Sequence, residues 1–126
     1  ILTIEKIDLE LPIVEGLTEE NLRYALAHMA ASAAIGQEGS CCIFGHRNYT
    51  YGEYFNRLDE LEIGDKFTIE TADGVMHEYI VIKKEILLPD HPALTDNGTD
   101  GRICSLITCH PVRIASHRLV IRARER

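Results

Sequence analysis

The chain has 126 residues and a mass of 14.2 kDa, which is too small for two ordinary domains and predicts a single domain over residues 1–126. Hydrophobic residues make up 45% of it, enough for a packed core that needs no disulfide. The formal net charge of −7 and the pI near 5.3 exclude a general affinity for nucleic acid, because such binding depends on a surplus of cationic side chains.

The charge is unevenly distributed along the chain. Residues 1–100 hold 7 Lys or Arg and 19 Asp or Glu, whereas residues 101–126 hold 6 Arg and only Glu125. We expect this basic segment to be a solvated strand. The sequence contains no apolar run of about 18 residues and no signal sequence, so we expect the native protein to have further segments.

The first third of the chain predicts a strand, a helix and a second strand. Apolar and acidic residues alternate over 7–13, which indicates a half-buried strand that ends at Pro12. Thr18 is typical of a helix N-cap, and apolar residues then recur at helical spacing, which predicts a helix over 18–34. The apolar run Cys41–Phe44 predicts a buried strand, and His46 follows its end.

The remainder of the chain predicts mainly strands. A short helix is expected over 53–58, and the Asp73-Gly74 turn is expected to join a strand over 66–71 to a long, bulged strand over 75–88.

Two further β-rich runs, 102–108 and 118–124, flank the connection 109–117, and they follow a loop over 89–101 that is long enough to be functional. The total is seven or eight strands with one or two short helices. This predicts an all-β fold, a closed or nearly closed barrel.

The four cysteines do not have the spacing of a metal site. Cys41 and Cys42 are adjacent, so they point to opposite faces of a strand and are poorly placed to bind one zinc ion. We expect Cys41, Cys42 and Cys104 to be inert packing residues, since cysteine is commonly buried.

Cys109 differs from the other three because it lies at the end of its predicted strand. If the last two strands form an antiparallel hairpin, Cys109 faces Arg118 near the base of the loop, with Cβ atoms about 5 Å apart. A guanidinium favours thiolate over thiol and donates hydrogen bonds to an oxyanion. Of the histidines, His46 alone follows a buried strand and a glycine, which makes it the candidate proton donor. From the residues alone, an inert barrel remains an alternative.

Three segments resemble the motifs of a known family, in that family's order. Ser105–Cys109 (SLITC) closely resembles the Thr-Leu-x-Thr-Cys signature of sortases, with Ser105 where threonine is usual. Phe44–Arg47 is similar to the Gly-His motif, and Ser116–Val120 to the arginine strand. The resemblance extends over nearly the whole chain, including the opening Leu-Pro-Ile at 11–13 and Gly64-Asp65.

This resemblance implies a sortase-type β-barrel in which Cys109 is the nucleophile, His46 the general acid and base, and Arg118 the stabiliser of the transition state. Residues 45–47 and 49–52 are most similar to class D sortases. His110-Pro111 and Ser116–Arg118 also resemble class C, the pilus-building group.

The implied activity is transpeptidation. The enzyme would cleave an LPxTG-like sorting signal between Thr and Gly and transfer the acyl group to an amine of a peptidoglycan precursor or, in class C, of a pilin. The implied location is the outer face of the membrane of a Gram-positive bacterium, with an anchor outside this sequence. A purely hydrolytic cysteine peptidase and a noncatalytic peptide-binding barrel are the competing hypotheses.

Other candidate features carry weaker expectations. The pattern Asp96-x-Gly98-x-Asp100 resembles the start of a calcium loop but lacks the later ligands of an EF-hand, so we expect no cofactor and no bound calcium. Arg113 is expected to be a solvated or substrate-edge charge. The apolar residues flanking this loop are either core or a pocket for the sorting signal; they are Leu87, Leu88, Pro89, Ala93 and Leu94. Surface or hydrogen-bonded roles are expected for His77, His91, His110 and His117.

Overall fold

The computed structural model describes residues 1–46, 55–95, 101–110 and 116–126, except for the side chains of Ala93, Thr95 and His110. The strands in this part are β1 (Leu2–Ile4), β2 (Leu9–Leu11), β3 (Ile13–Glu15), β4 (Leu26–His28), β5 (Gly39–Phe44), β6 (Lys66–Glu70), β7 (Met76–Leu87), β8 (Arg102–His110) and β9 (His117–Glu125). The helices there are the α-helix α1 (Glu19–Tyr24) and the 3-10 helices η1 (Glu5–Ile7), η2 (Leu58–Glu60) and η3 (Pro92–Thr95).

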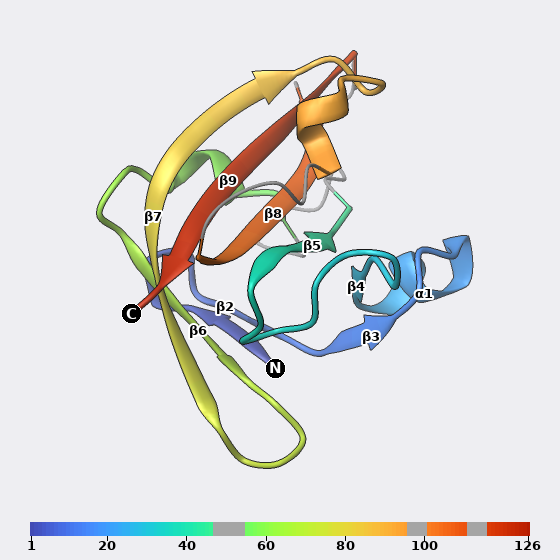
Figure 1. The fold of residues 1–126 in the computed structure, drawn as a ribbon. Helices are drawn as coiled ribbons and strands as arrows, with labels where there is room; N and C mark the ends of the chain where they lie inside the picture. Colours follow the sequence, from blue (N-terminus) through green and yellow to red (C-terminus); the bar gives the residue numbers. More distant parts are fainter. Residues whose placement is uncertain (47–54, 96–100, 111–115) are drawn as a thin grey trace.

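The described strands form one nine-stranded sheet in the order β2-β1-β6-β7-β9-β8-β5-β4-β3. Its two edge strands, β2 and β3, are separated in sequence only by Pro12, so the sheet has to curl round until its edges meet. Pro12 has no amide hydrogen to donate, but its carbonyl accepts from the Leu26 amide at 3.1 Å. The result is the predicted nearly closed all-β barrel, in which β7, β8 and β9 are long curved strands and α1 lies beside β3 and β4 (Figure 1).

The N-terminal third differs from the sequence prediction in two places. The strand expected over 7–13 is interrupted at Asp8, which adopts a left-handed conformation (φ 52°), and again at Pro12. The helix expected over 18–34 begins as predicted, with the Thr18 side chain accepting from the Asn21 amide, but it ends at Tyr24. The prediction was wrong beyond that point because residues 26–28 are buried as a strand between β3 and β5.

The predictions for the second half are largely confirmed. The Asp73-Gly74 turn joins β6 to β7, and β7 shifts register between Val81 and Lys83, as expected for a bulged strand. The short helix expected over 53–58 lies later, at η2, and residues 53 and 54 are outside the described residues. The loop expected over 89–101 contains η3, and β8 extends through Cys109 to His110.

The apolar side chains form two clusters on opposite faces of the sheet. The larger cluster fills the barrel and includes Cys41, Leu106 and Ile121. The smaller cluster lies on the outer face of β5, β8 and β9, and its buried residues are Cys42, Leu94, Ile107 and Val120. Cys41, Cys42 and Cys104 are all buried, as expected, and the opposite orientation of the first two is also as predicted.

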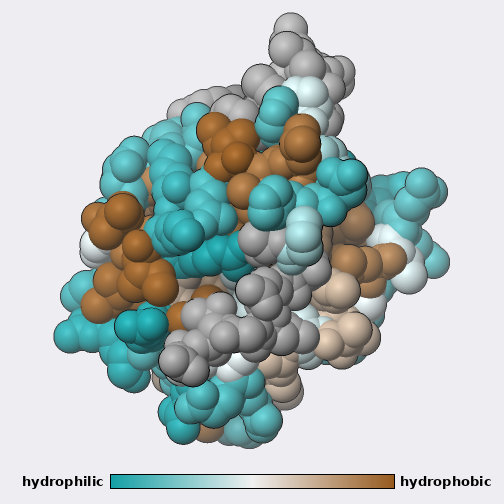
Figure 2. Space-filling model, turned by 45° about the horizontal axis from the view of Figure 1, so that its top comes forward, coloured by the Kyte–Doolittle hydropathy of each residue, from teal (hydrophilic) through white to brown (hydrophobic). Residues whose placement is uncertain are grey.

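The apolar residues around the 89–101 loop divide between core and surface. Leu94 is buried in the smaller cluster and Leu87 packs against it, whereas Leu88 is exposed. Figure 2 shows several separate apolar patches on one face, with hydrophilic residues between them.

The expectation of a solvated basic strand was wrong for one of its arginines. Arg122 in β9 is buried; its Nη1 donates to Ser105 Oγ at 3.0 Å, and its Nε lies 3.6 Å from Glu85. Arg124 and Arg126 are exposed, as expected. These arginines share one face of β9, so their position along the strand explains the difference. Arg122 pairs with Lys83 on β7 and Ser105 on β8, whereas Arg124 and Arg126 lie close to the end of β9 or beyond it.

Candidate active site

The three residues predicted for catalysis lie at the ends of three adjacent strands. Cys109 near the end of β8 pairs directly with Arg118 near the start of β9, in the predicted antiparallel hairpin. Strand β5 runs parallel to β8 with Phe44 opposite Ile107, so continuing that register by two residues brings His46 level with Cys109. His46, Cys109 and Arg118 therefore form one row across the same edge of the sheet, which we call the outer row.

Side-chain alternation places this row on the outer face. Ile107 and Val120, two residues from Cys109 and Arg118 respectively, both belong to the smaller apolar cluster, and Phe44, two residues before His46, packs against it. The apolar side chains beneath the outer row support its polar side chains, which extend toward solvent. His46 is exposed, and Cys109 and Arg118 are half-buried.

Gly45 has a packing reason to be glycine. A Cβ atom at this position would lie 2.6 Å from Leu26 Cδ2 and 2.6 Å from Phe55 Cδ2, closer than carbon atoms approach. The lack of a side chain lets the backbone before His46 lie directly against the barrel core. The Phe55 amide also donates to the His46 carbonyl at 3.0 Å, so the backbone of His46 is held by a hydrogen bond from a residue later in the chain.

Thr108 connects the cysteine strand to the histidine strand. Its buried hydroxyl donates to the Gly45 carbonyl at 2.8 Å, and the Gly45 amide donates to the Ile107 carbonyl at 3.1 Å. The parallel pairing of β5 and β8 thus continues to the residues immediately before His46 and Cys109. The sequence motif contains this threonine, but only the strand register shows which acceptor it reaches.

On the other side of the row, Arg118 is held by its own strand. Its Nη1 donates to the His117 carbonyl at 2.9 Å, and the His117 ring lies 2.8 Å from Ser116 Oγ. This confirms a hydrogen-bonded role for His117. His77, another of the histidines considered, is also paired: its Nδ1 lies 3.0 Å from Glu125 Oε2.

The chemistry that this row supports follows from its three side chains. A sulfur nucleophile, an imidazole and a guanidinium on neighbouring strands are the groups needed to attack a carbonyl, donate a proton to a leaving group and stabilise an oxyanion. Among the described residues, no cluster of three or more His, Cys, Asp or Glu side chains could hold a metal ion.

Several predicted features lie outside the described residues. They are Arg47, the class D-like segment 49–52, the calcium-like pattern 96–100, Pro111 and Arg113, and nothing is described of the His110 side chain. No helix in the described part of the chain has the length and apolar character needed to cross a bilayer.

Comparisons with known proteins agree with this geometry. The sortase domain family model matches residues 2–126. Sortase SrtE1 of Streptomyces coelicolor is 29% identical over 139 residues, covering 96% of this chain and 38% of the relative. Sortase D of Bacillus subtilis is 32% identical over 111 residues, covering 88% of this chain and 54% of the relative. The chain thus spans between about two fifths and just over half of these relatives.

Solved structures show the same architecture. Sortase C1 of Streptococcus agalactiae superposes with a TM-score of 0.92 at 26% identity, covering 99% of this chain and 65% of that protein. Sortase A of Corynebacterium diphtheriae gives a TM-score of 0.91 at 30% identity, covering 99% of this chain and 59% of that protein. The family match over almost the entire sequence, together with the strand arrangement, shows that this chain belongs to the sortase family.

Proposed function

We propose that this protein is a cysteine transpeptidase in which Cys109 is the nucleophile, His46 the general acid and base, and Arg118 the oxyanion stabiliser. The observation that supports this proposal best is the outer row, because strand register alone aligns these three side chains at one edge of β5, β8 and β9. Family membership supports the same reaction class.

In the first half of the proposed reaction, the Cys109 thiolate attacks the carbonyl carbon of a peptide bond. Arg118 donates hydrogen bonds to the oxyanion that forms, and its fixed position on β9 means that little reorganisation is needed when charge develops. The C–N bond then breaks, protonated His46 gives its proton to the leaving amine, and a thioester to Cys109 remains.

In the second half, an amine resolves the thioester. Neutral His46 takes a proton from the attacking amine, the C–S bond breaks, and Cys109 leaves as the thiolate. Water can replace the amine, so a hydrolytic reaction accompanies transfer. The exposure of His46 leaves its ring accessible for proton exchange between the two halves.

The proposed donor is an LPxTG-like sorting signal cut between Thr and Gly, and the acceptor is an amine of a cell-wall precursor. We place the enzyme in class D from residues 45–47 and 49–52, and at the outer face of a Gram-positive membrane. Class C similarity makes a pilin lysine the second candidate acceptor, and one of the similar solved structures is described as a pilus-related sortase C of Group B Streptococcus.

The test is to incubate the protein with a panel of sorting-signal peptides and two kinds of amine, oligoglycine-type and lysine-type. We expect cleavage between Thr and Gly, with most product joined to one amine class. A preference for the lysine amine would indicate pilin assembly. Cleavage with no amine incorporation would support a hydrolytic peptidase, and no cleavage of any peptide would support a noncatalytic barrel.

Arg118 distinguishes the transpeptidase from an ordinary cysteine peptidase. Arg118→Ala is expected to lower kcat by roughly 10²–10³, the usual cost of removing an oxyanion donor. Arg118→Lys should recover only part of the rate, because lysine lacks the forked donors. The matched control is Arg124→Ala, an exposed arginine on the same strand and face, which should stay close to wild type. Near-normal turnover of Arg118→Ala would contradict the proposed role.

A further inference from the structure

A second set of chemically reactive side chains lies across β3, β4, β5 and β8, on the face opposite the outer row. Glu15 on β3 pairs with His28 on β4, and Cys41 on β5 pairs with Cys104 on β8. His28 is opposite Ile43 in the β4–β5 pairing, so it lies diagonal to Cys41 on the same face. We call Glu15, His28, Cys41 and Cys104 the inner row. None of them belongs to the proposed catalytic site.

Hydrogen bonding favours the protonated form of His28. Its Nδ1 lies 2.8 Å from a Glu15 carboxylate oxygen, and its Nε2 lies 2.8 Å from the Ala33 carbonyl oxygen. Both of these oxygens accept hydrogen bonds, which favours a proton on each ring nitrogen; the Ser32 hydroxyl also lies 3.2 Å from Nε2. These contacts favour the imidazolium form of His28, although its side chain is only 8% exposed.

The two thiols of the inner row have different acidities. The hydrogen bond from Cys104 and the positive charge of His28 lower the pKa of Cys41, despite the opposing effect of burial. Burial, followed by the interaction with Cys41, raises the pKa of Cys104 well above its ordinary value. Cys41 is thus the more acidic sulfur of the pair, and Cys104 the less acidic one.

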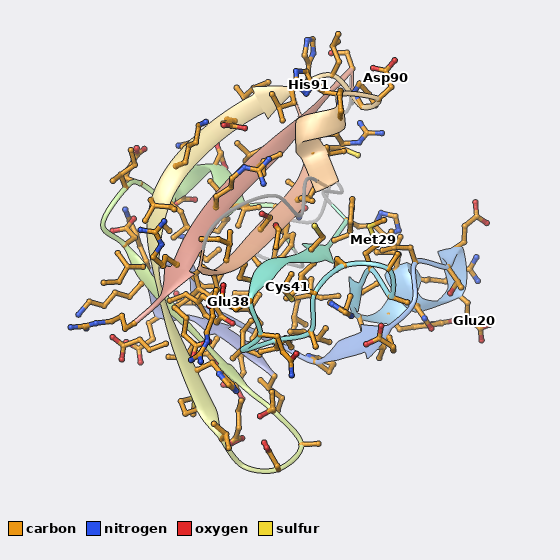
Figure 3. All side chains as sticks on the ribbon, in the orientation of Figure 1. Glu20, Met29, Glu38, Cys41, Asp90 and His91 are labelled. Carbon is orange, nitrogen blue, oxygen red and sulfur yellow. The ribbon has the colours of Figure 1, made fainter. Side chains whose placement is uncertain are left out.

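The separation of the two strands suits a covalent bond between these sulfurs. Neighbouring strands lie about 4.8 Å apart, within the Cα separation of about 4.4–6.8 Å that disulfides span. Cys42 offers a direct contrast: it is next to Cys41 in sequence, but it points to the outer face, and burial raises its pKa. In Figure 3 the labelled Cys41 lies on β5 among the side chains that fill the middle of the molecule.

Small solutes can reach the glutamate end of this row. Glu15 and His28 line a cavity of about 710 Å³ whose other walls include Ile35, Ile69 and Thr71. This cavity adjoins the β6–β7 turn at one end of β7, whereas Arg118 is paired with Leu87 at the other end. The cavity and the outer row therefore lie at opposite ends of β7. Cys41 itself is only 1% exposed, so a reagent that reaches it past His28 has to be small.

We propose that Cys41 and Cys104 are a redox-active dithiol that hydrogen peroxide converts to a disulfide between β5 and β8. The Cys41 thiolate attacks one peroxide oxygen, so that an S–O bond forms, the O–O bond breaks, and the leaving hydroxide takes up a proton to become water. Cys104 then loses its proton and attacks the Cys41 sulfur; the S–S bond forms, and the sulfenic oxygen leaves with a proton as a second water. Two thiols and one peroxide thus give one disulfide and two waters.

The test uses a variant in which only these two cysteines remain, Cys42→Ala with Cys109→Ala. This background is needed because one tryptic peptide, 24–47, contains both Cys41 and Cys42, and another, 103–113, contains both Cys104 and Cys109. After hydrogen peroxide treatment and alkylation of the remaining thiols in denaturant, we expect the two peptides to be linked, and dithiothreitol to release them. Thiols that stay alkylatable, or that are oxidised separately without linkage, would overturn the proposal.

The matched control is Cys41→Ala with Cys109→Ala, which retains Cys42 beside Cys104 in the same peptides. We expect no linked peptide from this control, because Cys42 lies on the opposite face of the sheet. Linkage as fast as in the test variant would contradict the proposal. The wild-type protein, mapped by fragmentation of the linked peptides, should give the same Cys41–Cys104 bond, so the result does not depend on how well the variants fold.

The role of His28 is tested by its effect on the rate. His28→Gln keeps a hydrogen-bonding side chain but removes the cation, and it is expected to slow disulfide formation several-fold at neutral pH. An unchanged rate would remove His28 from the proposed site. Because all of these measurements follow the thiols and not peptide turnover, their outcome is independent of the proposed transpeptidase.

Discussion

Strand β8 carries two cysteines five residues apart whose surroundings differ in almost every respect. Cys109 lies near the strand end on the outer face, half-buried beside Arg118, whereas Cys104 is fully buried on the inner face beside Cys41. In a pleated strand, positions whose numbers differ by an odd amount point to opposite faces. The comparison shows that one strand can hold a half-buried cysteine near its end on one face and a fully buried cysteine on the other.

The two rows also differ in how they are assembled. The outer row is at the ends of β5, β8 and β9, where side chains have solvent on one side, and motifs in the sequence identify its members. The inner row crosses β3, β4, β5 and β8 from the exposed Glu15 to the fully buried Cys104, and the buried polar group His28 finds its partners within the protein. The following predictions test this contrast, beginning with the largest expected effect.

The largest expected effects concern how much each cysteine contributes to peptide turnover and how fast its thiol is alkylated. Cys109→Ala should lower turnover of a cleaved sorting peptide by roughly 10³-fold or more, because the nucleophile is lost. Cys104→Ala, which deletes a sulfur on the inner face, should retain most of the activity per folded molecule.

In the reduced protein, alkylation followed by mass spectrometry should label Cys109 on the order of a hundredfold faster than the other three cysteines. Equal labelling of all four thiols would remove the distinction between the rows.

Gly45→Ala tests the packing that supports the outer row. The added methyl group would collide with Leu26 and Phe55, and such overpacking typically costs about 1–3 kcal/mol. We expect a lower free energy of unfolding in denaturant melts and a loss of peptide turnover in the fraction that remains folded. Gly64→Ala is a useful comparison: nothing lies within 4 Å of its Cβ position, so its cost comes only from its positive φ of 96°. Unchanged turnover in Gly45→Ala would show that His46 is positioned without this contact.

Thr108→Val should have a smaller effect. It keeps the side-chain shape but removes the hydrogen bond to the buried Gly45 carbonyl, at a cost of about 1–2 kcal/mol. Because that bond joins the histidine and cysteine strands, we expect kcat to fall more than KM changes. Thr68→Val on β6 is the control, since Thr68 makes no side-chain hydrogen bond among the described residues. A fall in stability with unchanged kcat would mean that Thr108 only holds the strands together.

The smallest expected effect is a pH dependence that originates in the inner row. Burial lowers the pKa of His28, but its bonds to Ala33 and Glu15 and the Cys41 charge outweigh this, so its pKa lies above the ordinary 6.5. The stabilisation is therefore complete below about pH 6.5 and is lost as the pH rises through the folded pKa.

Glu15→Gln isolates this contribution. It removes the carboxylate that faces His28 from β3 and leaves Cys41 and Cys104 in place on β5 and β8. The difference in unfolding free energy between wild type and variant should be largest in mildly acidic solution, where the carboxylate is ionised and the imidazole protonated. It should shrink as the pH rises, with the imidazole titration followed by NMR. A difference that grows with pH would show that the carboxylate does not stabilise an imidazolium.

The sequence was most informative where local pattern and local structure coincide. The β6–β7 hairpin follows from Asp73-Gly74 between two apolar runs, and the pairing of Cys109 with Arg118 follows from two strands joined by a short connection. It failed for residues 26–28, because a spacing that suits a helix face also suits a short buried strand. The pairing of these residues with both β3 and β5 is a tertiary effect that the local pattern does not contain.

The sequence by itself determined the all-β class, the sortase motifs, and the identity of the three outer-row residues, because strand period, turn residues and motif order are properties of the linear chain. Only the tertiary structure decided which distant residues share the inner face. Glu15, His28, Cys41 and Cys104 span almost ninety positions, and parallel registers at β3–β4 and β5–β8 bring them into one row. Parallel pairing joins segments through long connections, so its register is set by the packing of the whole barrel.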